Sequence, residues 1–366
     1  VATAIAVGGP GAVLWMWISA IFGMTTKFAE VVLSVRYRER TEDGRFIGGP
    51  MHYISEGLGW KWLAVLFALF GALASFGIGN MTQANSIADA MNTSFNVPHV
   101  ASGIVVAVAA GVVMLGGLKR IAQVVELLVP FMAAFYIIGG IVILAKYAGQ
   151  IPAAFKLIFE GAFTGTAAAG GFAGSTIALA SRMGIARGVF SNEAGLGSAP
   201  IAHAAATTDH PVRQGLWGVF EVFMDTIVVC SITALSIVLT GVWNSGETGA
   251  ALTTAAFNTS IPVIGGYIVS VGVLLFAYST LLSWSYYGER CMEFLFGPKA
   301  ITPYRLVFIP FIFIGAVGGL TVIWDIADTL NGLMAIPNLI GLVGLSGVVI
   351  KLTKEFFSGT YAAEKK

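Results

Sequence analysis

The feature that most constrains this chain is the stretch Ala186–Ala206, ARGVFSNEAGLGSAPIAHAAA, which interrupts a long apolar region. It contains Arg187, Glu193, Pro200 and three glycines, a composition that disfavours an uninterrupted helix. At membrane depth, non-helical backbone persists only where it is buried in protein or lines a watery cavity. A discontinuous helix of this kind leaves backbone groups free to hold a carboxylate and a cation together. The alternative is a glycine-rich kink that only lets helices pack closely.

The composition is that of a polytopic membrane protein. Of all residues 57% are hydrophobic and 11% are charged, whereas soluble domains carry about 25% charged residues. The mean hydropathy is +0.84. The 46 glycines suit helices that pack through small residues, and Gly315 and Gly319 form one small-xxx-small pair.

Several classes of function are disfavoured by the motifs. The sequence has no G-x-x-x-x-G-K phosphate loop, no G-x-S-x-G elbow and no H-E-x-x-H pair. Its four histidines are scattered without metal-ligand spacing, and Cys230 and Cys291 lie in or beside apolar runs, so no disulfide framework is implied. We therefore expect neither an enzyme nor an ATP-driven pump, and no organic cofactor.

Apolar runs of roughly 18 residues or more are typical of membrane spans. They predict nine spans, at approximately 12–36, 62–90, 100–118, 124–145, 172–203 (the interrupted one), 214–240, 262–289, 302–324 and 327–350. Residues 1–9 resemble the tail of a tenth, and the sequence opens in mid-pattern without an initiator Met. We therefore expect a fragment that lacks its true N-terminus, with the N-terminal part of the fold missing.

Basic residues predict the orientation, because cytoplasmic loops are enriched in Lys and Arg. The loops on one side contain most of them, whereas the opposite loops hold only Lys146 and Lys156. This places the C-terminus in the cytoplasm of a multi-pass protein of the cell membrane. The residues on the cytoplasmic side are Arg36, Arg38, Arg40, Arg45, Lys61, Lys119, Arg120, Arg213, Arg290, Lys299, Arg305, Lys351, Lys354, Lys365 and Lys366.

An internal repeat is also predicted. Spans starting near 12, 62, 100 and 124 are echoed by spans starting near 214, 262, 302 and 327, an offset close to 200 each time. Five spans separate the copies, so the second copy crosses the membrane in the opposite sense. Inverted repeats that each open on a broken helix are typical of secondary transporters. The single transporter domain 1–366 then divides into most of a first repeat at 1–150, a second repeat at 160–352 and a cytoplasmic tail at 353–366.

Two long motifs resemble one known family. GGPGAVLWMWISAIFG at Gly8–Gly23 and FSNEAGLGSAPIAHAA at Phe190–Ala205 closely resemble the two hallmark segments of the alanine or glycine:cation symporters, the sodium:alanine symporters. GNMTQANSIADAM at Gly79–Met91 and AYSTLLSW at Ala277–Trp284 are similar to it as well. The family usually has Phe in place of Leu14, a conservative difference. The resemblance extends over essentially the whole chain.

The resemblance implies an all-α fold of the amino acid–polyamine–cation superfamily, the LeuT-like five-plus-five inverted repeat with discontinuous helices. It implies inward transport of small neutral amino acids driven by sodium or sometimes protons, with no obligatory protein partner and no nucleic acid. Family members also carry a further N-terminal helix and a G-N-I-A-G break immediately before VATAIA, both absent from this sequence.

In the break itself, freed backbone groups near Phe190–Gly195 are candidates for binding the substrate, together with the side chains of Phe190, Ser191 and Asn192. Phe190 would shape the side-chain pocket. Asn192 either bonds the substrate or braces the loop, and the residues favour neither role over the other.

Charges within spans usually face the interior and pair. We expect Arg187 and Glu193 to form an internal salt bridge that pins the break, with a gate or coupling element as the alternative. Glu221 or Asp225, one turn apart, are substitute partners for Arg187, and Asp225 is grouped with the structural or gating charges. Lys27 and Glu30, at i and i+3, are predicted to pair with each other.

Asn80 and Gln83 place two amides inside an apolar span, where each needs a partner. We expect Gln83 to reach the substrate amino group and count Asn80 among the substrate-binding candidates. The alternative for both residues is a hydrogen bond between helices, and for Asn80 this alternative is favoured.

Ser279, Thr280 and Trp284 follow one another in the span at 262–289. Hydroxyl oxygens are hard ligands, so Ser279 and Thr280 are candidates for a sodium site, and the resemblance strengthens this by placing the span against the first broken helix. The alternative is bonding back to their own helix. Thr280 and Trp284 are also substrate-binding candidates. Trp284 either closes the pocket or lies at the membrane interface.

The sequence therefore predicts a sodium-coupled symporter for alanine or glycine that works by alternating access. Proton coupling through Glu193 or Asp225 is the alternative within transport. A channel would be expected to present a ring of identical elements from several subunits, which an internal repeat argues against. Alanine cannot be ranked against glycine or serine, because one methyl group is worth only about 1–3 kcal/mol.

Overall fold

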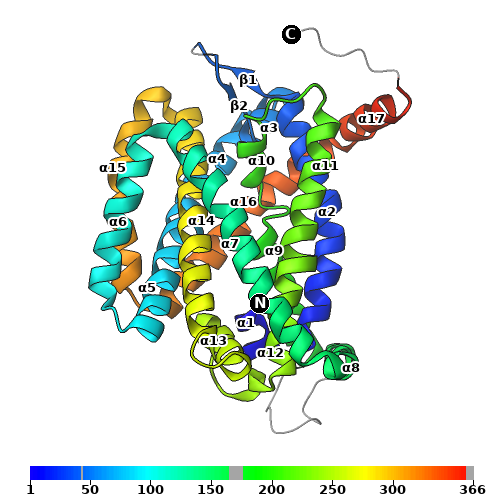
Figure 1. Ribbon diagram of the computed structural model, residues 1–366. Coiled ribbons are helices and arrows are strands. Elements are labelled where there is room, and N and C mark those ends of the chain that lie inside the picture. Colours follow the sequence, from blue (N-terminus) through cyan, green and yellow to red (C-terminus); the bar gives the residue numbers. More distant parts are fainter. Residues whose placement is uncertain (43, 165–175, 360–366) are drawn as a thin grey trace.

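The computed structural model describes residues 1–42, 44–164 and 176–359, and it is helical apart from one short hairpin (Figure 1). Within these residues, seven helices are long and apolar enough to cross a membrane. The prediction of an all-α polytopic membrane protein is confirmed.

The first part of the chain contains the hairpin and the helices that precede the interrupted span. Its elements are α1 (Ala2–Gly8), α2 (Ala12–Arg36), β1 (Glu39–Arg40), β2 (Phe46–Ile47), α3 (Pro50–Leu58), α4 (Lys61–Phe76), the π-helical η1 (Gly77–Met81), α5 (Thr82–Phe95), α6 (His99–Leu115), α7 (Gly117–Lys146), the short η2 (Ala148–Gln150) and α8 (Ile151–Phe163).

The second part begins with the interrupted span. Its elements are α9 (Ile177–Asn192), α10 (Ala199–His203), α11 (Pro211–Val222), the π-helical η4 (Phe223–Cys230), α12 (Ser231–Leu239), η5 (Val242–Asn244), α13 (Gly249–Ser260), α14 (Gly265–Phe296), η6 (Pro298–Ala300), α15 (Ile301–Val317), α16 (Leu320–Gly344) and α17 (Ser346–Phe357).

Seven of the nine predicted spans coincide with these helices, with two differences at their ends, whereas the span expected at 100–118 is the shorter apolar helix α6 and the interrupted span at 172–203 contains α9 and α10. The span expected at 62–90 is a rod from Lys61 to Phe95 that runs through α4, η1 and α5. The span expected at 302–324 ends at Val317, because Gly318 and Gly319 adopt extended backbone angles that stop α15 before α16 begins. Residues 172–175 of the interrupted span lie outside the described residues.

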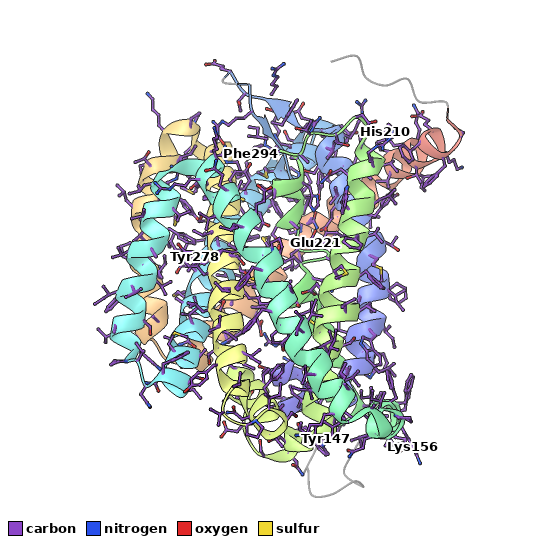
Figure 2. All side chains as sticks on the ribbon, viewed as in Figure 1. Tyr147, Lys156, His210, Glu221, Tyr278 and Phe294 are labelled. Carbon is purple, nitrogen blue, oxygen red and sulfur yellow. The ribbon has the colours of Figure 1, made fainter. Side chains whose placement is uncertain are left out.

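The basic loops gather at one end of the molecule. The antiparallel hairpin β1–β2, α3 and α17 lie at that end, whereas α8 and α13 lie at the other (Figure 1). Figure 2 likewise places Lys156 and Tyr147 at the opposite end from His210 and Phe294. The predicted partition of positive charge is therefore seen in the fold, with Lys365 and Lys366 outside the described residues.

The hairpin is fastened to α3 through a hydrogen bond between side chains. Nδ1 of His52 lies 2.9 Å from Oε1 of Glu39, and this hydrogen bond lowers the pKa of the Glu39 carboxyl. The guanidinium of Arg38 stacks over the ring of Phe46, 3.9 Å from its centroid. These contacts hold the first loop against α3 and against the end of α2.

The core and the lipid face follow from the apolar composition. The largest cluster of buried side chains joins α2, α3, α4, α14 and α16 and includes Leu33, Tyr53, Phe67 and Trp284. Large apolar side chains on α6, α7 and α16 are exposed instead, and Val343 is 77% exposed. Exposed apolar surface of this extent suits contact with lipid.

Glycines allow α15 to pack closely on the rod formed by α4, η1 and α5. A Cβ added at Gly315 would lie 2.4 Å from the Cα of Met81, whereas one added at Gly319 would meet nothing within 4 Å. Of the predicted small-residue pair, Gly315 alone is at this helix contact. Gly319 lies outside it, because α15 has already ended.

We expect Gly315→Ala to destabilise the protein by about 1–3 kcal/mol, as overpacking against backbone does. Gly319→Ala is the matched control, since its φ of −71° suits alanine and its surroundings are open. The melting temperature of purified protein in detergent measures both. Equal melting temperatures for the two variants would contradict the close contact.

Candidate substrate and cation site

The predicted helix break is present. The helix α9 ends at Asn192 and α10 begins at Ala199, with Pro200 in the first turn of α10, where proline is tolerated. Between them, Gly195 and Gly197 take left-handed φ angles of 89° and 81°. The sequence Glu-Ala-Gly-Leu-Gly-Ser therefore turns the chain without continuing the helix.

Glu193 is the strained residue of the break. It adopts φ 57°, which is unfavourable for a residue with a Cβ and concentrates at functional positions. Its carboxylate accepts hydrogen bonds from Nε1 of Trp284 and from Oγ of Ser198, both at 2.7 Å. Trp284 is 1% exposed, so the interfacial alternative for this indole is wrong.

Two adjoining cavities lie against the break, with volumes of about 340 and 300 Å³, at the lower end of the range for small-molecule sites. Both are lined by Gln83, Ser191, Asp225, Phe276, Thr280 and Trp324. Phe190, Arg187, Glu193 and Trp284 line the second cavity alone. The structure thus brings most of the predicted site residues into one place.

The two adjoining cavities are together called the cavity below. Two π-helical segments lie beside it, and such segments are frequent at functional sites. In η1 the carbonyl of Ile78 accepts hydrogen bonds from the side chains of Gln83 (2.9 Å) and Thr82 (2.6 Å). In η4 the carboxylate of Asp225 accepts hydrogen bonds from the hydroxyls of Ser191 (2.8 Å) and Thr226 (2.7 Å). Asp225 therefore reaches the cavity from a distorted helix and Gln83 from the first turn of α5, directly after one, which no pattern in the sequence revealed.

Three predicted site residues are turned away from the cavity. Asn80 is fully buried and donates to the carbonyl of Phe308 at 2.7 Å, the interhelical alternative. Asn192 donates to Oγ1 of Thr226 at 3.0 Å and accepts from the amide of Ala194, so it braces the loop.

Ser279 is the third. Its hydroxyl bonds back to the carbonyl of Phe276 at 2.9 Å, and it does not line either cavity. Thr280, the next residue on α14, lines both cavities. The structure therefore separates the pair that was expected to bind sodium together, and only Thr280 lies at the cavity.

The predicted charge pairs are wrong. Arg187 pairs in a bidentate manner with Asp328 on α16, with Nη1 to Oδ1 at 3.1 Å, rather than with Glu193, Glu221 or Asp225. Lys27 lies 3.7 Å from Oε1 of Glu221 on α11 rather than pairing with Glu30. In both cases a residue distant in sequence is closer in the folded chain than the neighbour on the same segment.

Some cavity residues were not foreseen from the sequence. Trp324 stacks on Phe190 with ring centroids 5.0 Å apart, and Arg187 lies over both rings. Asp328 and Trp324 belong to an apolar span at i and i+4, a spacing that places them on one helix face. That spacing is the signal that could have placed Asp328 beside Trp324, which is the one of the two that lines the cavities.

The chemistry of the cavity suits an amino acid and an alkali cation. Among the described residues, no group of three or more His, Cys, Asp or Glu could hold a transition metal. The lining instead offers the hydroxyls of Thr3, Ser86 and Thr280, the carboxylates of Asp225 and Glu193, and aromatic walls. Hard oxygen donors of this kind suit alkali cations, and apolar walls with a few polar groups suit a small organic ligand.

Comparison with known proteins decides the family. The model of the sodium:alanine symporter family matches residues 1–366. The chain belongs to the sodium:alanine symporter family. It is 52% identical over 364 residues to the sodium/alanine symporter AgcS of Methanococcus maripaludis, covering 97% of this chain and 79% of that relative.

Two further relatives come from Bacillus subtilis. The probable sodium/glutamine symporter GlnT is 38% identical, covering 97% of this chain and 74% of GlnT, and the putative sodium/proton-dependent alanine carrier protein YrbD is 36% identical, covering 97% and 76%. The family and these relatives are transporters rather than enzymes, which confirms the class predicted from the sequence. Their names differ in substrate and in coupling ion.

We expect the Arg187–Asp328 pair to show as coupling in a double-mutant cycle. Arg187→Gln should lower the melting temperature because it leaves Asp328 without its partner, and Asp328→Asn should do the same. The double variant should be more stable than the sum of the two losses predicts, by about 0.5–1 kcal/mol for a pair that is partly exposed. Additive losses in detergent melts would show that the ion pair contributes nothing.

Proposed function

We propose that this protein is a secondary active symporter that carries small neutral amino acids, alanine or glycine, coupled to sodium. The observation that carries the proposal is the cavity at the helix break, where a carboxylate, hydroxyls and an amide converge among aromatic rings. Membership of the family supports the coupling to sodium.

For the substrate we propose Gln83, Phe190, Ser191, Thr280 and Trp284. Gln83 keeps its amide oxygen available for an ammonium group, because only its nitrogen is engaged with Ile78. Phe190 and Trp284 bound the space for the side chain, which limits substrate size. Asn80 and Asn192 serve the surrounding structure, as their hydrogen bonds indicate.

For the cation we propose Thr280 with Asp225, whose carboxylate lines both cavities. Ser191 and Thr226 donate to this carboxylate and hold its orientation. Proton coupling through Asp225 or Glu193 remains the second candidate, since both carboxyls line the cavity and one relative is named for sodium or protons.

The mechanism we propose is alternating access in a five-plus-five inverted repeat, with the basic end and the C-terminus in the cytoplasm. In support, α2, α4, α6 and α7 start at Ala12, Lys61, His99 and Gly117, and α11, α14, α15 and α16 start at Pro211, Gly265, Ile301 and Leu320. The two sets are offset by about 200 residues throughout. One bundle would rock against the other around the break.

The deciding experiment is alanine uptake into proteoliposomes with and without an inward sodium gradient. We expect uptake that collapses when potassium or choline replaces sodium. Uptake that persists without sodium and fails at alkaline pH would favour proton coupling instead. Absence of uptake for every small neutral amino acid, by folded protein, would refute the proposal.

A neighbouring pair of variants tests the cavity assignment. Thr280→Val removes a hydroxyl that faces the cavity and should raise the KM for alanine or sodium about tenfold, the effect of losing one hydrogen bond or ligand. Ser279→Ala is the matched control, because that hydroxyl bonds its own helix, and its KM values should stay within about twofold. The opposite ranking would move the cation site to the other face of α14.

A further inference from the structure

The buried carboxylate of Glu30 is used neither by the cavity nor by an ion pair within 4 Å among the described residues. It lies in the C-terminal third of α2, fully buried, and its Oε2 has no hydrogen-bond partner in the described part of the chain. Burying a carboxylate costs free energy unless the group is paired or hydrogen-bonded. The hydrogen bonds of its other oxygen, Oε1, show what the carboxylate does in the fold.

Glu30 bonds the backbone of the helix break from outside. Its Oε1 accepts a hydrogen bond from the amide of Gly197 at 3.0 Å and another from Nδ2 of Asn338 on α16 at 2.5 Å. The same Asn338 nitrogen donates to the carbonyl of Gly195 at 2.9 Å. Gly195 and Gly197 are the two left-handed glycines that turn the chain between α9 and α10.

The bridge is itself held in place. The hydroxyl of Tyr53 on α3 donates to Oδ1 of Asn338, and both residues are fully buried. One amide therefore links α16, α3, α2 and the break, and each of its polar ends has a partner. An apolar residue at position 30 would leave the Gly197 amide and one Asn338 proton unsatisfied in the interior.

Two further side chains, in and just after the C-terminal end of α2, hydrogen-bond to the backbone of α10 and of the residues that follow it. One turn beyond Glu30, the hydroxyl of Ser34 donates to the carbonyl of Pro200 at 2.6 Å. Just past the end of α2, Nη1 of Arg38 donates to the carbonyl of Ala206 at 2.7 Å. Each contact is made to the main chain of the broken helix. Side chains from α2 therefore fix the path of that backbone whatever side chains the broken helix carries.

We propose that Glu30 is a positioning residue of the transport site: with Asn338 it holds the break in the shape that forms one wall of the cavity. Glu193, which lines the cavity, lies only two residues before Gly195, so displacement of the glycines displaces the wall. This inference rests on the proposed function. Glu30 acts through the backbone and does not touch the substrate.

The test is the alanine affinity, measured by titration calorimetry in sodium, of full-length variants that melt cooperatively. Glu30→Ala should raise the Kd about tenfold, the value of a hydrogen bond to a charged group, and Asn338→Ala should act in the same direction. Glu30→Gln should stay within about threefold of wild type, since its amide oxygen can accept both bonds. Glu56→Ala, an exposed carboxylate on α3, is the matched control and should change nothing.

The double variant Glu30→Ala with Asn338→Ala should be no worse than the weaker-binding single variant, because both remove the same bridge. Should Glu30→Ala fail to fold, Asn338→Ala and Glu30→Gln carry the comparison. Wild-type affinity in folded Asn338→Ala, or a Glu30→Gln variant as impaired as Glu30→Ala, would overturn the inference. A wild-type protein that binds no alanine would instead refute the proposed function.

Discussion

The rest of this structure depends on satisfying backbone groups that a broken helix frees inside an apolar bundle. No water is available there to replace the lost helical bonds, so each freed group needs a partner from elsewhere in the fold. Glu30 and Asn338 supply partners for Gly197 and Gly195, and Asn192 supplies one for Ala194. The packing of α2 and α16 against the break follows from this requirement.

The break in turn determines where chemistry can occur. At the start of the break, Glu193 adopts a left-handed backbone conformation. Its carboxylate accepts hydrogen bonds from Trp284 and Ser198. The π-helical segments η1 and η4 add a second kind of irregular backbone around the same cavity, where Gln83 and Asp225 are presented. Irregular backbone is thus concentrated where a polar ligand would be bound, while the lipid face is built from regular apolar helices.

The charged side chains around the break pair across helices. Glu221 lies midway between the two ends of the molecule (Figure 2), within 3.7 Å of Lys27 and 3.0 Å of His203. Arg187 reaches Asp328, which lies 141 residues later in the chain. These three pairs join α2, α10 and α9 to a different helix, so separating these helices would carry an electrostatic cost as well as a packing cost.

The sequence by itself determined the membrane class, the positions of most spans, the partition of positive charge, a break within Ala186–Ala206 and, through its motifs, the family. These follow from composition, apolar run length and residues such as Gly195 and Pro200 whose backbone preferences are local. Only the tertiary structure decided which polar residues face one another. Asn80 and Ser279 point away from the cavity that Gln83 and Thr280 line, although each lies close in sequence to its counterpart. The partners of Arg187, Lys27 and Glu30 lie on other helices, so no spacing along the chain encodes those pairs.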